Sequence, residues 1–333
     1  MTSLPPAYVH PGPPPEPPEY PEGLPPLRQG ADTWKWWTGL LVLALAFTVP
    51  IVLGIFAGIG IAVSGGDLED DMPSGVLIAL TFAQDIGFIL APLLMAGWLA
   101  ARPKAEDFGL APPRRPWIAA LLLLGVYLAF VVISGIYVEL GGFEAEDQLP
   151  DELGVDESTV NLVLVLFLVV VMAPVAEELL FRGYVYRALR NGTGVWVAAL
   201  VSGLIFGGIH LGSSPTEFIP PLMLLGVGLA LLYQWTGSLY APVALHAFNN
   251  SIAFGVSQDW GWEIPVTIAG SIVVSLRARK LLARGRGPRR PNAACRAPAR
   301  GASARAARRR SSPRSSPGSP SPSPARPRTR SSC

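Results

Sequence analysis

The chain contains a series of apolar segments, each about as long as a membrane-spanning helix. Roughly 20 consecutive apolar residues are needed for an α-helix to cross a hydrocarbon core of about 30 Å. Eight such segments can be counted, with approximate bounds 37–63, 75–101, 116–140, 159–190, 195–211, 218–235, 240–256 and 262–276. Half of the 333 residues are hydrophobic, which disfavours a soluble globular fold. The pattern predicts an all-α, polytopic protein of the plasma membrane with about eight transmembrane helices.

The distribution of basic residues between these segments predicts the orientation of the chain. Short cytoplasmic loops are enriched in Lys and Arg, whereas Asp and Glu contribute little to orientation. Basic residues gather after the second, fourth and eighth segments (Arg102, Lys104, Arg114, Arg115, Arg187, Arg190, Arg277, Arg279 and Lys280). The other loops carry almost none. This alternation supports eight spans and places both termini in the cytoplasm.

The two ends of the chain differ in composition from this apolar region. Residues 1–36 are rich in proline, which favours extended conformations without a packed core, so we expect a disordered cytoplasmic arm. Residues 284–333 contain fourteen arginines and no acidic residue. This tail is either a disordered segment that can bind an anionic leaflet or the product of a shifted reading frame. The transmembrane domain is then expected to be residues 37–283.

Charge and cysteine content exclude several classes of protein. The net charge of +2 arises from the tail, because residues 1–283 carry 12 Lys and Arg against 24 Asp and Glu, a balance of −12. The transmembrane region therefore gives no support to nucleic-acid binding. Both cysteines, Cys295 and Cys333, lie in the tail, which excludes a disulfide framework or a thiolate metal cage in the apolar region.

The segment APVAEELLFRGYVYRAL, residues 173–189, places Glu177, Glu178 and Arg182 at the end of an apolar run. Ionisable residues at membrane depth are costly, and they indicate a functional site by default. Glu178 and Arg182 are four residues apart, so they share a helix face and can neutralise each other. Glu177 points about 100° away from that face. We interpret Glu178 and Arg182 as a structural pair and Glu177 as the carboxylate that faces a cavity.

Two later segments supply polar partners for these carboxylates. His210 ends the sequence Phe206-Gly-Gly-Ile-His210, in which the glycines permit close approach of another helix. His246 begins the sequence HAFNN and lies one helical turn from Asn250, on the same face. Both imidazoles are expected to lie within the membrane.

A depth argument relates Glu177 to His210. If the fourth and fifth segments form a hairpin that turns at residues 191–194, Glu177 lies 14 residues before the turn and His210 lies 16 after it. At 1.5 Å per residue the two side chains are about 21 and 24 Å from the turn. The hairpin therefore places Glu177 and His210 at the same level.

Each of these signals also has a structural interpretation. A single buried histidine is usually a hydrogen-bonded core residue, and a Glu–Arg pair one turn apart commonly stabilises a helix. Intramembrane Glu and His also occur along transport pathways. A non-proteolytic transporter, or a protein that uses the polar cluster for binding, therefore remains an alternative to an enzyme.

Three motifs in this region resemble those of the CPBP family, which contains the type II CAAX prenyl endopeptidases and the bacteriocin-processing or immunity proteins, also called Abi. The motifs are EELLFR at 177–182, FGGIH at 206–210 and HAFNN at 246–250, within about residues 160–260. They match the Glu-Glu-x-x-x-Arg, Phe-x-x-x-His and His-x-x-x-Asn patterns of the family. The resemblance implies an intramembrane endopeptidase with an eight-helix core.

The resemblance also implies roles for individual residues. Glu177 and His210 would hold and activate a water molecule for attack on a peptide carbonyl, with Glu177 as the general base. His246 and Asn250 would stabilise the developing oxyanion. Glu178 and Arg182 would orient the site.

A zinc-dependent mechanism and a metal-free one both remain open. Glu177, His210 and His246 would be the three protein ligands of a zinc ion with an open position for water, and the family is commonly called a metalloprotease family. The chain lacks an HExxH helix, however, and the same side chains suffice without a metal. The expected substrate is a membrane-anchored peptide or protein within the lipid bilayer. The alternative is a non-proteolytic transporter, or an immunity or scaffold protein.

Overall fold

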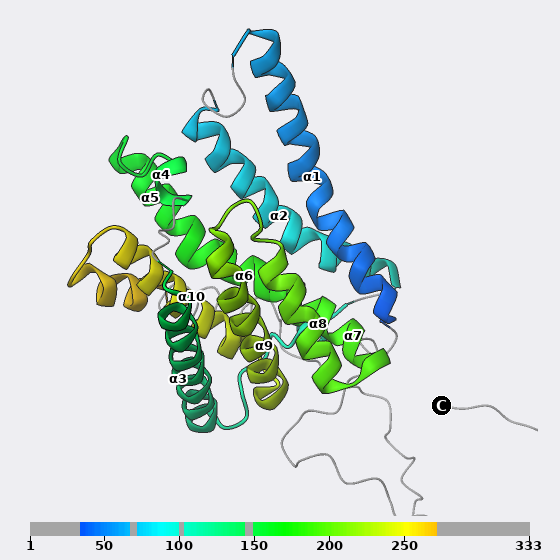
Figure 1. The fold of residues 1–333 in the computed structure, drawn as a ribbon. Coiled ribbons are helices and arrows are strands. Elements are labelled where there is room, and N and C mark those ends of the chain that lie inside the picture. The colour runs from blue at the N-terminus through cyan, green and yellow to red at the C-terminus, as the bar shows by residue number, and fades with distance from the viewer. Residues whose placement is uncertain (1–33, 67–71, 100–102, 144–148, 272–333) are drawn as a thin grey trace, which may run out of the picture. The chain divides into compact units, whose positions relative to one another are not determined.

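The computed structural model describes residues 34–66, 72–99, 103–143 and 149–271 (Figure 1). These residues form helices joined by turns, and the described part of the chain contains no strand beyond an isolated bridge between Leu211 and Ser214. They all belong to one compact unit, Met1–Gly285. The expectations for residues 1–33 and for the tail at 284–333 lie outside the described residues.

The observed helices agree closely with the apolar segments of the sequence. Single helices are α1 (Trp36–Val63), α2 (Ser74–Leu99), α3 (Pro116–Gly141), α8 (Val195–Gly208), α9 (Ile219–Thr236) and α10 (Tyr240–Ser257). One long helical stretch, Thr159–Thr193, contains α5 (Thr159–Phe167), η3 (Leu168–Met172), α6 (Ala173–Glu178), η4 (Leu179–Val185) and α7 (Tyr186–Thr193). Short helices in the loops are η2 (Ala105–Phe108), α4 (Leu149–Glu152) and η5 (Thr216–Phe218).

Five helical stretches among the described residues are long and apolar enough to cross a membrane. They are Trp36–Val63, Ser74–Leu99, Pro116–Gly141, Thr159–Thr193 and Thr216–Thr236. Helix α8 is also apolar but has only 14 residues, and the eighth expected segment is helical over residues 263–271, beyond which the chain is not described. The structure thus confirms an all-helical, multi-pass membrane architecture.

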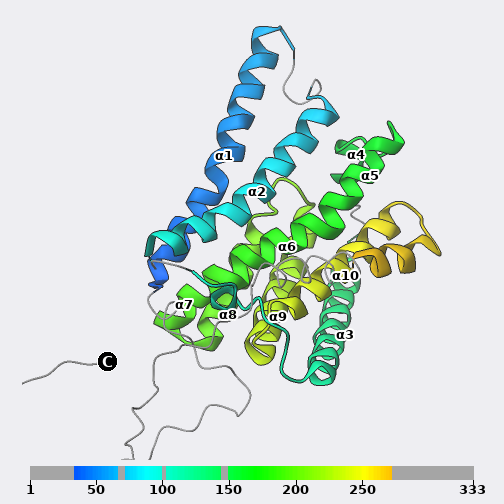
Figure 2. The ribbon, with the colours of Figure 1, turned by 180° about the vertical axis from the view of Figure 1, so that it is seen from behind.

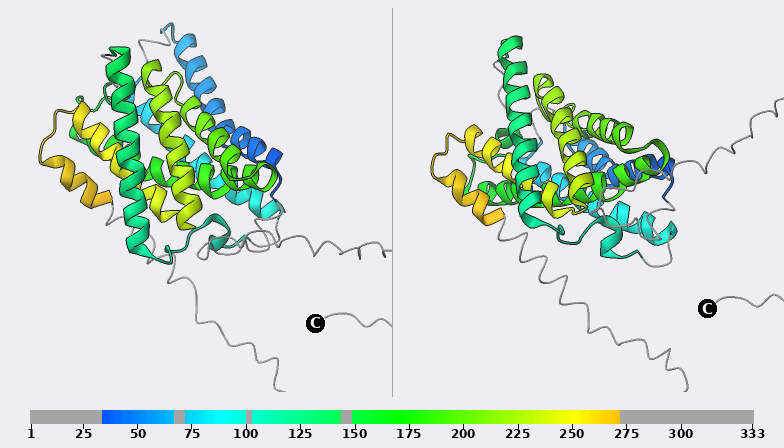
Figure 3. Two further views of the ribbon diagram at one scale, coloured as in Figure 1. Left: turned by 60° about the horizontal axis from the view of Figure 1, so that its bottom comes forward. Right: turned by 90° about the horizontal axis from the view of Figure 1, so that it is seen from below.

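The long helical stretch lies in the middle of the helix arrangement. Helices α1 and α2 pack against each other on one side of it, whereas α3, α9 and α10 lie on the other (Figures 1 and 2). Helix α3 runs alongside α9 in both views of Figure 3. Many large apolar side chains of α1 and α3 are exposed, as expected for helices that face lipid. Buried polar side chains of the central stretch are thereby kept away from lipid.

Helices α8 and α9 cross at very short range because glycines line their contact. A Cβ atom on Gly203 would lie 2.5 Å from Val227 Cγ2, and one on Gly207 would lie 2.6 Å from the Met223 nitrogen. The close approach expected from the FGGIH segment is therefore confirmed at Gly207, whereas Gly208 faces open space. This crossing brings the end of α8 close to the central stretch.

The connection between α7 and α8 is tighter than the sequence suggested. Helix α7 continues to Thr193, so the turn expected at residues 191–194 is reduced to Gly194. Gly194 has a φ of +83°, a conformation that glycine adopts without steric cost. Trp34 is buried and stacks on Tyr184, with ring centroids 4.2 Å apart.

Candidate active site

The two glutamates lie at the end of α6, between two π-helical segments, η3 and η4. π-Helical turns leave some backbone carbonyls without their usual partners, and they are frequent at functional sites. One such carbonyl is used here: Asn250 Nδ2 on α10 donates to Val169 O in η3 at 3.0 Å. Asn250 therefore ties α10 to the central stretch, eight residues before Glu177.

Glu178 is the most heavily engaged of the acidic residues. Its Oε1 accepts a hydrogen bond from Arg182 Nη1 at 2.8 Å and lies 3.0 Å from His246 Nδ1. The side chains of Glu178 and Arg182 are fully buried. Arg182 Nη2 also donates to Gly226 O on α9 at 2.7 Å, and its guanidinium lies 4.5 Å from the centre of the Phe206 ring. The expected Glu178–Arg182 pair is thus formed, and it also holds His246.

Glu177 faces the other side of the same imidazole. Its Oε2 lies 3.9 Å from His246 Nε2 and has no hydrogen-bond partner. Since Glu178 accepts a hydrogen bond only when Nδ1 carries the proton, a neutral His246 presents an unprotonated Nε2 toward Glu177. A separation of 3.9 Å is too long for a direct hydrogen bond, but a water molecule can bridge polar groups at such distances.

His210 lies just beyond the end of α8 and is half-buried. Its Nδ1 is 2.8 Å from Phe206 O, one turn back along the chain. The Phe206 ring contacts both imidazoles, with centroid distances of 5.4 Å to His210 and 5.5 Å to His246. Within the described residues His210 makes no ion pair with Glu177 or Glu178. The imidazole that directly faces Glu177 is therefore that of His246.

Glu177, His210 and His246 are the residues that the sequence suggests as zinc ligands. The described residues contain no group of three or more His, Cys, Asp or Glu side chains placed to hold a metal ion. His246 Nδ1 is directed at Glu178, whose Oε1 also accepts from Arg182, and His210 Nδ1 is directed at a backbone carbonyl. Glu177, His210 and His246 therefore do not form a three-ligand site in this structure.

Sequence reasoning missed one buried carboxyl group beside the site. Asp85 on α2 is 1% exposed, and its Oδ2 has no hydrogen-bond partner. Helix α2 packs against α6, which carries both glutamates. Asp85 is the only acidic residue within the apolar segment 75–101. Like Glu177, Asp85 is an ionisable residue within an apolar segment, a signal of a functional site that the sequence already contains.

A second buried polar cluster lies further along the same helical stretch, around Arg187. The guanidinium of Arg187 donates to the hydroxyl of Tyr233 and to the backbone carbonyl of Asp107. The Tyr233 hydroxyl donates in turn to Phe108 O at 3.2 Å. These contacts fix the loop helix η2 against α7 and α9. Arg187, interpreted from the sequence as a marker of orientation, is thus a buried structural residue.

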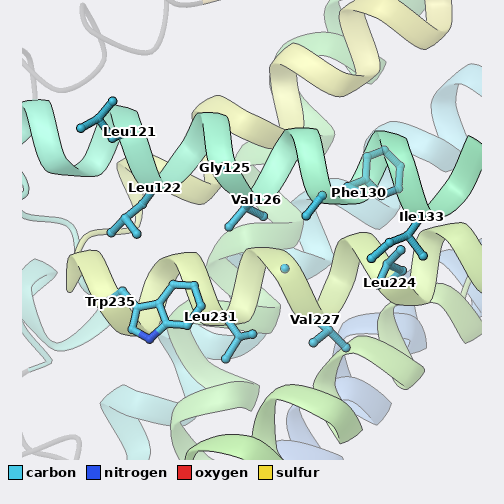
Figure 4. A pocket seen from close by; sticks show the side chains of 12 residues that line it. Leu121, Leu122, Gly125, Val126, Phe130, Ile133, Leu224, Val227, Leu231 and Trp235 are labelled. Carbon is cyan, nitrogen blue, oxygen red and sulfur yellow. The ribbon is translucent and has the colours of Figure 1, made fainter.

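A cavity of about 370 Å³ lies away from the glutamates, between α3 and α9 (Figure 4). Its lining is almost entirely apolar and includes Leu121, Val126 and Phe130 from α3 with Leu224 and Leu231 from α9. None of the candidate site residues contributes to it. The cavity therefore plays no part in the chemistry considered for the glutamates.

Comparison with known proteins identifies relatives over the same region. Residues 159–252 match the family model of the type II CAAX prenyl endopeptidase Rce1-like proteins. An uncharacterized 24.3 kDa protein of Escherichia coli is 30% identical over 157 residues, which are 42% of this chain and 72% of that protein. The membrane-embedded CAAX protease MroQ of Staphylococcus aureus is 24% identical over 183 residues, 52% of this chain and 72% of the relative.

A third relative, the uncharacterized protein YpbD of Bacillus subtilis, is 29% identical over 137 residues, which are 40% of this chain and 66% of that protein. No solved structure matches the chain. The matched region contains the Glu177–Arg182, Phe206–His210 and His246–Asn250 motifs and the helices that carry them. The chain therefore belongs to the CPBP family, the family of the type II CAAX prenyl endopeptidases and their Rce1-like relatives.

Proposed function

We propose that the protein is an intramembrane endopeptidase that hydrolyses a peptide bond of a membrane-anchored peptide or protein. The observation that carries this proposal is the pairing of Glu177 Oε2, which has no hydrogen-bond partner, with His246 Nε2 at 3.9 Å. A carboxylate and an imidazole at this separation can hold one water molecule between them. Family membership supports the same reaction class.

In the proposed reaction Glu177 acts as the general base. It accepts a proton from the water while the water oxygen bonds to the substrate carbonyl carbon, and it then gives that proton to the leaving amine. Glu178 and Arg182 hold His246 in place through Nδ1. Neutral His246 accepts the other hydrogen bond of the water at Nε2, while Glu178 accepts the hydrogen bond from its Nδ1.

His210 and Asn250 complete the proposed site. His210 can act through Nε2, the nitrogen that Phe206 O does not engage. Asn250 can act through the amide proton that it does not give to Val169 O. The division of roles differs from the sequence-based interpretation in one respect: His246, rather than His210, is the imidazole assigned to the water. His210 is then assigned to the substrate.

The proposed topology consists of eight membrane spans with both termini in the cytoplasm. The basic loops of the sequence support it. Reporter fusions at residues 66, 143, 212 and 259, and at both termini, would test it. We expect the termini to report the cytoplasm and the four loops to report the opposite side. A cytoplasmic signal from any of the four loops would contradict the topology.

The proposed chemistry uses side chains alone and passes no step through a metal ion. Purified protein in detergent should therefore retain cleavage after treatment with a chelator. Elemental analysis of the same sample would show whether the active form carries zinc. Activity that falls with zinc content and returns on adding zinc would contradict this part of the proposal while leaving the peptidase assignment intact.

The decisive experiment compares membrane peptides from cells that express the wild-type chain, Glu177→Gln or His246→Ala. Asp107→Asn is the matched control, because Asp107 is a buried acidic residue in η2, remote from Glu177 in sequence and in a different cluster. We expect specific cleavage products with wild type and Asp107→Asn, and their loss with both site variants. Identical peptide profiles in all four strains would favour the transporter, immunity or scaffold alternative.

A further inference from the structure

The apolar cavity of about 370 Å³ between α3 and α9 is not used by the proposed chemistry. Three of its lining residues, Leu121, Ile133 and Trp235, are 60%, 50% and 46% exposed. The cavity is therefore open to the surroundings of the two helices. Those surroundings are lipid, because α3 is apolar and long enough to cross a membrane. A hydrocarbon chain is the kind of molecule that reaches this cavity.

Small residues create the cavity where the two helices face each other. Gly125 and Ala129 on α3 and Gly228 on α9 belong to its lining. A Cβ atom on Gly228 would lie 2.9 Å from Val126 Cγ1, whereas one on Gly125 would meet nothing within 4 Å. The helices thus touch at Gly228 and leave a hollow beside Gly125 (Figure 4). A larger side chain at position 125 would fill this hollow.

The length of the cavity matches one leaflet of a bilayer. Along α3 its lining runs from Leu121 to Ile133, 12 positions that span about 18 Å. Half of a hydrocarbon core is about 15 Å thick. Leu121 lies six positions, or about 9 Å, after Arg115, which directly precedes α3. Since the headgroup region is about 5–7 Å deep, Arg115 at headgroup level places the cavity beside a single acyl chain.

The end of the cavity at Trp235 is basic. Trp235 and Leu121 lie at this end, near the start of α3 (Figure 4). Arg114 and Arg115 precede α3 and are exposed, and no ion pair within the described residues involves either of them. Tryptophan is typical of the membrane interface, where its indole N–H can donate to an oxygen of a lipid. Basic groups in this position attract the phosphate of an acidic phospholipid.

The opposite end of the cavity is acidic. Ile133 and Leu224 lie there (Figure 4). Glu139 lies near the end of α3, and Glu217 lies in η5, directly before α9. The described residues 134–143 and 211–223 include no Lys or Arg. A phosphate is repelled from this end, so the charges of the two ends define one direction for a bound acidic lipid.

We propose that the cavity binds an acidic phospholipid of the bilayer. One acyl chain lies between α3 and α9, and the phosphate lies at Arg114 and Arg115, beside Trp235. The charge at this end selects such a lipid over an uncharged apolar chain and over a second copy of the protein, neither of which supplies a phosphate. The site is separate from the proposed peptidase chemistry, because no candidate site residue lines the cavity.

Photo-labelling of the purified full chain in detergent micelles would locate this lipid. The probe is phosphatidylglycerol with a photoreactive diazirine in one acyl chain, and phosphatidylcholine with the same acyl chain is the comparison without net charge. We expect adducts on cavity-lining residues such as Val126 and Leu231. Labelling there should be at least about fivefold stronger with phosphatidylglycerol, because two arginines lie at the headgroup.

Two matched pairs of variants separate the acyl chain from the headgroup. Gly125→Leu fills the cavity and should abolish the labelling. Gly135→Leu should keep it, because Gly135 lies on the same helix with nothing within 4 Å of its Cβ position but outside the cavity. Arg115→Gln should weaken phosphatidylglycerol binding about fivefold and leave phosphatidylcholine unaffected. Lys35→Gln should change neither, although Lys35 precedes α1 as Arg115 precedes α3.

Thermal unfolding in the same micelles gives a readout that does not depend on photochemistry. Phosphatidylglycerol should raise the wild-type midpoint by about 2 °C more than phosphatidylcholine does. The difference should disappear in Gly125→Leu and shrink in Arg115→Gln. If Gly125→Leu fails to fold, the comparison of Arg115→Gln with Lys35→Gln still decides, because both side chains are exposed.

Three outcomes would overturn the proposal. Equal labelling by the two lipids would show that the cavity accepts any apolar chain, including a lipid anchor on a substrate. Labelling spread evenly over exposed residues of α1 and α3, and unchanged in Gly125→Leu, would indicate only the general lipid layer around the protein. A complex of two copies that is lost in Gly125→Leu and carries no lipid adduct would identify a second copy as the occupant. None of these outcomes depends on detecting cleavage, so the peptidase proposal is tested separately.

Discussion

Two buried polar clusters lie along the helical stretch Thr159–Thr193 and differ in how their polar atoms are satisfied. In the cluster around Arg187, the guanidinium and the Tyr233 hydroxyl bond to each other and to backbone carbonyls of residues 107 and 108. In the cluster around Glu177, buried polar atoms without a partner occur on four side chains, Asp85, Glu177, Glu178 and Arg182, whereas the Arg187 cluster contains one such atom, Asp107 Oδ1. Both clusters are buried to a similar degree.

The two clusters therefore differ in role: the Arg187 cluster holds helices and a loop together, and we propose that the Glu177 cluster carries the reaction. Buried polar groups in native proteins are almost always hydrogen-bonded, so a concentration of unsatisfied atoms requires an explanation. The Arg187 cluster anchors the loop before α3, which is also held by bonds from Leu239 N to Gly109 O and from Ser238 Oγ to Ala111 O. The Glu177 cluster retains free bonding capacity, which the proposed binding of water and substrate would use.

The largest expected effect is on activity, from Glu177→Gln. The amide cannot act as a general base, a role that typically contributes about 10²- to 10⁴-fold to rate. We expect a loss of this size in the cleavage rate of purified protein, with an unchanged helical circular dichroism spectrum. Activity within twofold of wild type would show that the unsatisfied cluster is not the site of chemistry.

Glu178→Gln should have the largest effect on stability. It removes the charge that faces fully buried Arg182, and leaving one member of a buried ion pair costs about 3–5 kcal/mol. Unfolding in mixed detergent micelles would measure this loss. The double variant Glu178→Gln with Arg182→Met should recover part of it, because no unpaired charge remains. A double variant as unstable as the sum of both changes would contradict the pairing.

Arg187→Met tests the satisfied cluster. It removes hydrogen bonds from a charged donor, which are worth about 1.5–3 kcal/mol, but leaves the carboxylates untouched. We expect a lower unfolding free energy and an unchanged kcat per folded molecule. A selective fall in kcat, with stability retained, would contradict the purely structural role of the Arg187 cluster.

The smallest expected effect concerns the helix crossing that supports both clusters. An added methyl group in Gly203→Ala meets Val227 at the α8–α9 contact, and overpacking of this kind costs about 1–3 kcal/mol. Gly208→Ala, on the same helix but facing open space, should change the unfolding free energy by less than about 0.5 kcal/mol. Equal effects of the two substitutions would argue against a glycine-dependent crossing.

Much of the helix arrangement could be predicted from the sequence because hydropathy is a local property. The expected bounds of the segments that became α1, α3 and α10 differ from the observed ones by a single residue at most. The membrane also makes intrahelical hydrogen bonding obligatory, so apolar length translates directly into helix length. Glu177, Glu178 and Arg182 could be recognised for the same reason, since charge in an apolar run is visible without a structure.

Counting residues along the predicted helical hairpin did not predict which imidazole faces Glu177. It placed Glu177 and His210 at one level along the membrane normal, but it contains no information on rotation about each helix axis. The two π-helical segments around α6 and the glycine-lined crossing of α8 and α9 set those rotations. Both depend on packing between helices that are distant in sequence.

The sequence by itself thus determined the class of fold, the helix boundaries and the carboxylates around which the site is built, because each depends on composition along a short stretch. Only the tertiary structure decided that His246 faces Glu177, that Glu178 joins Arg182 to this imidazole, and that α2 brings Asp85 to the site. The pairing of Glu177 with His246 joins residues that are 69 positions apart in the sequence. They follow from the directions in which packed helices present their side chains.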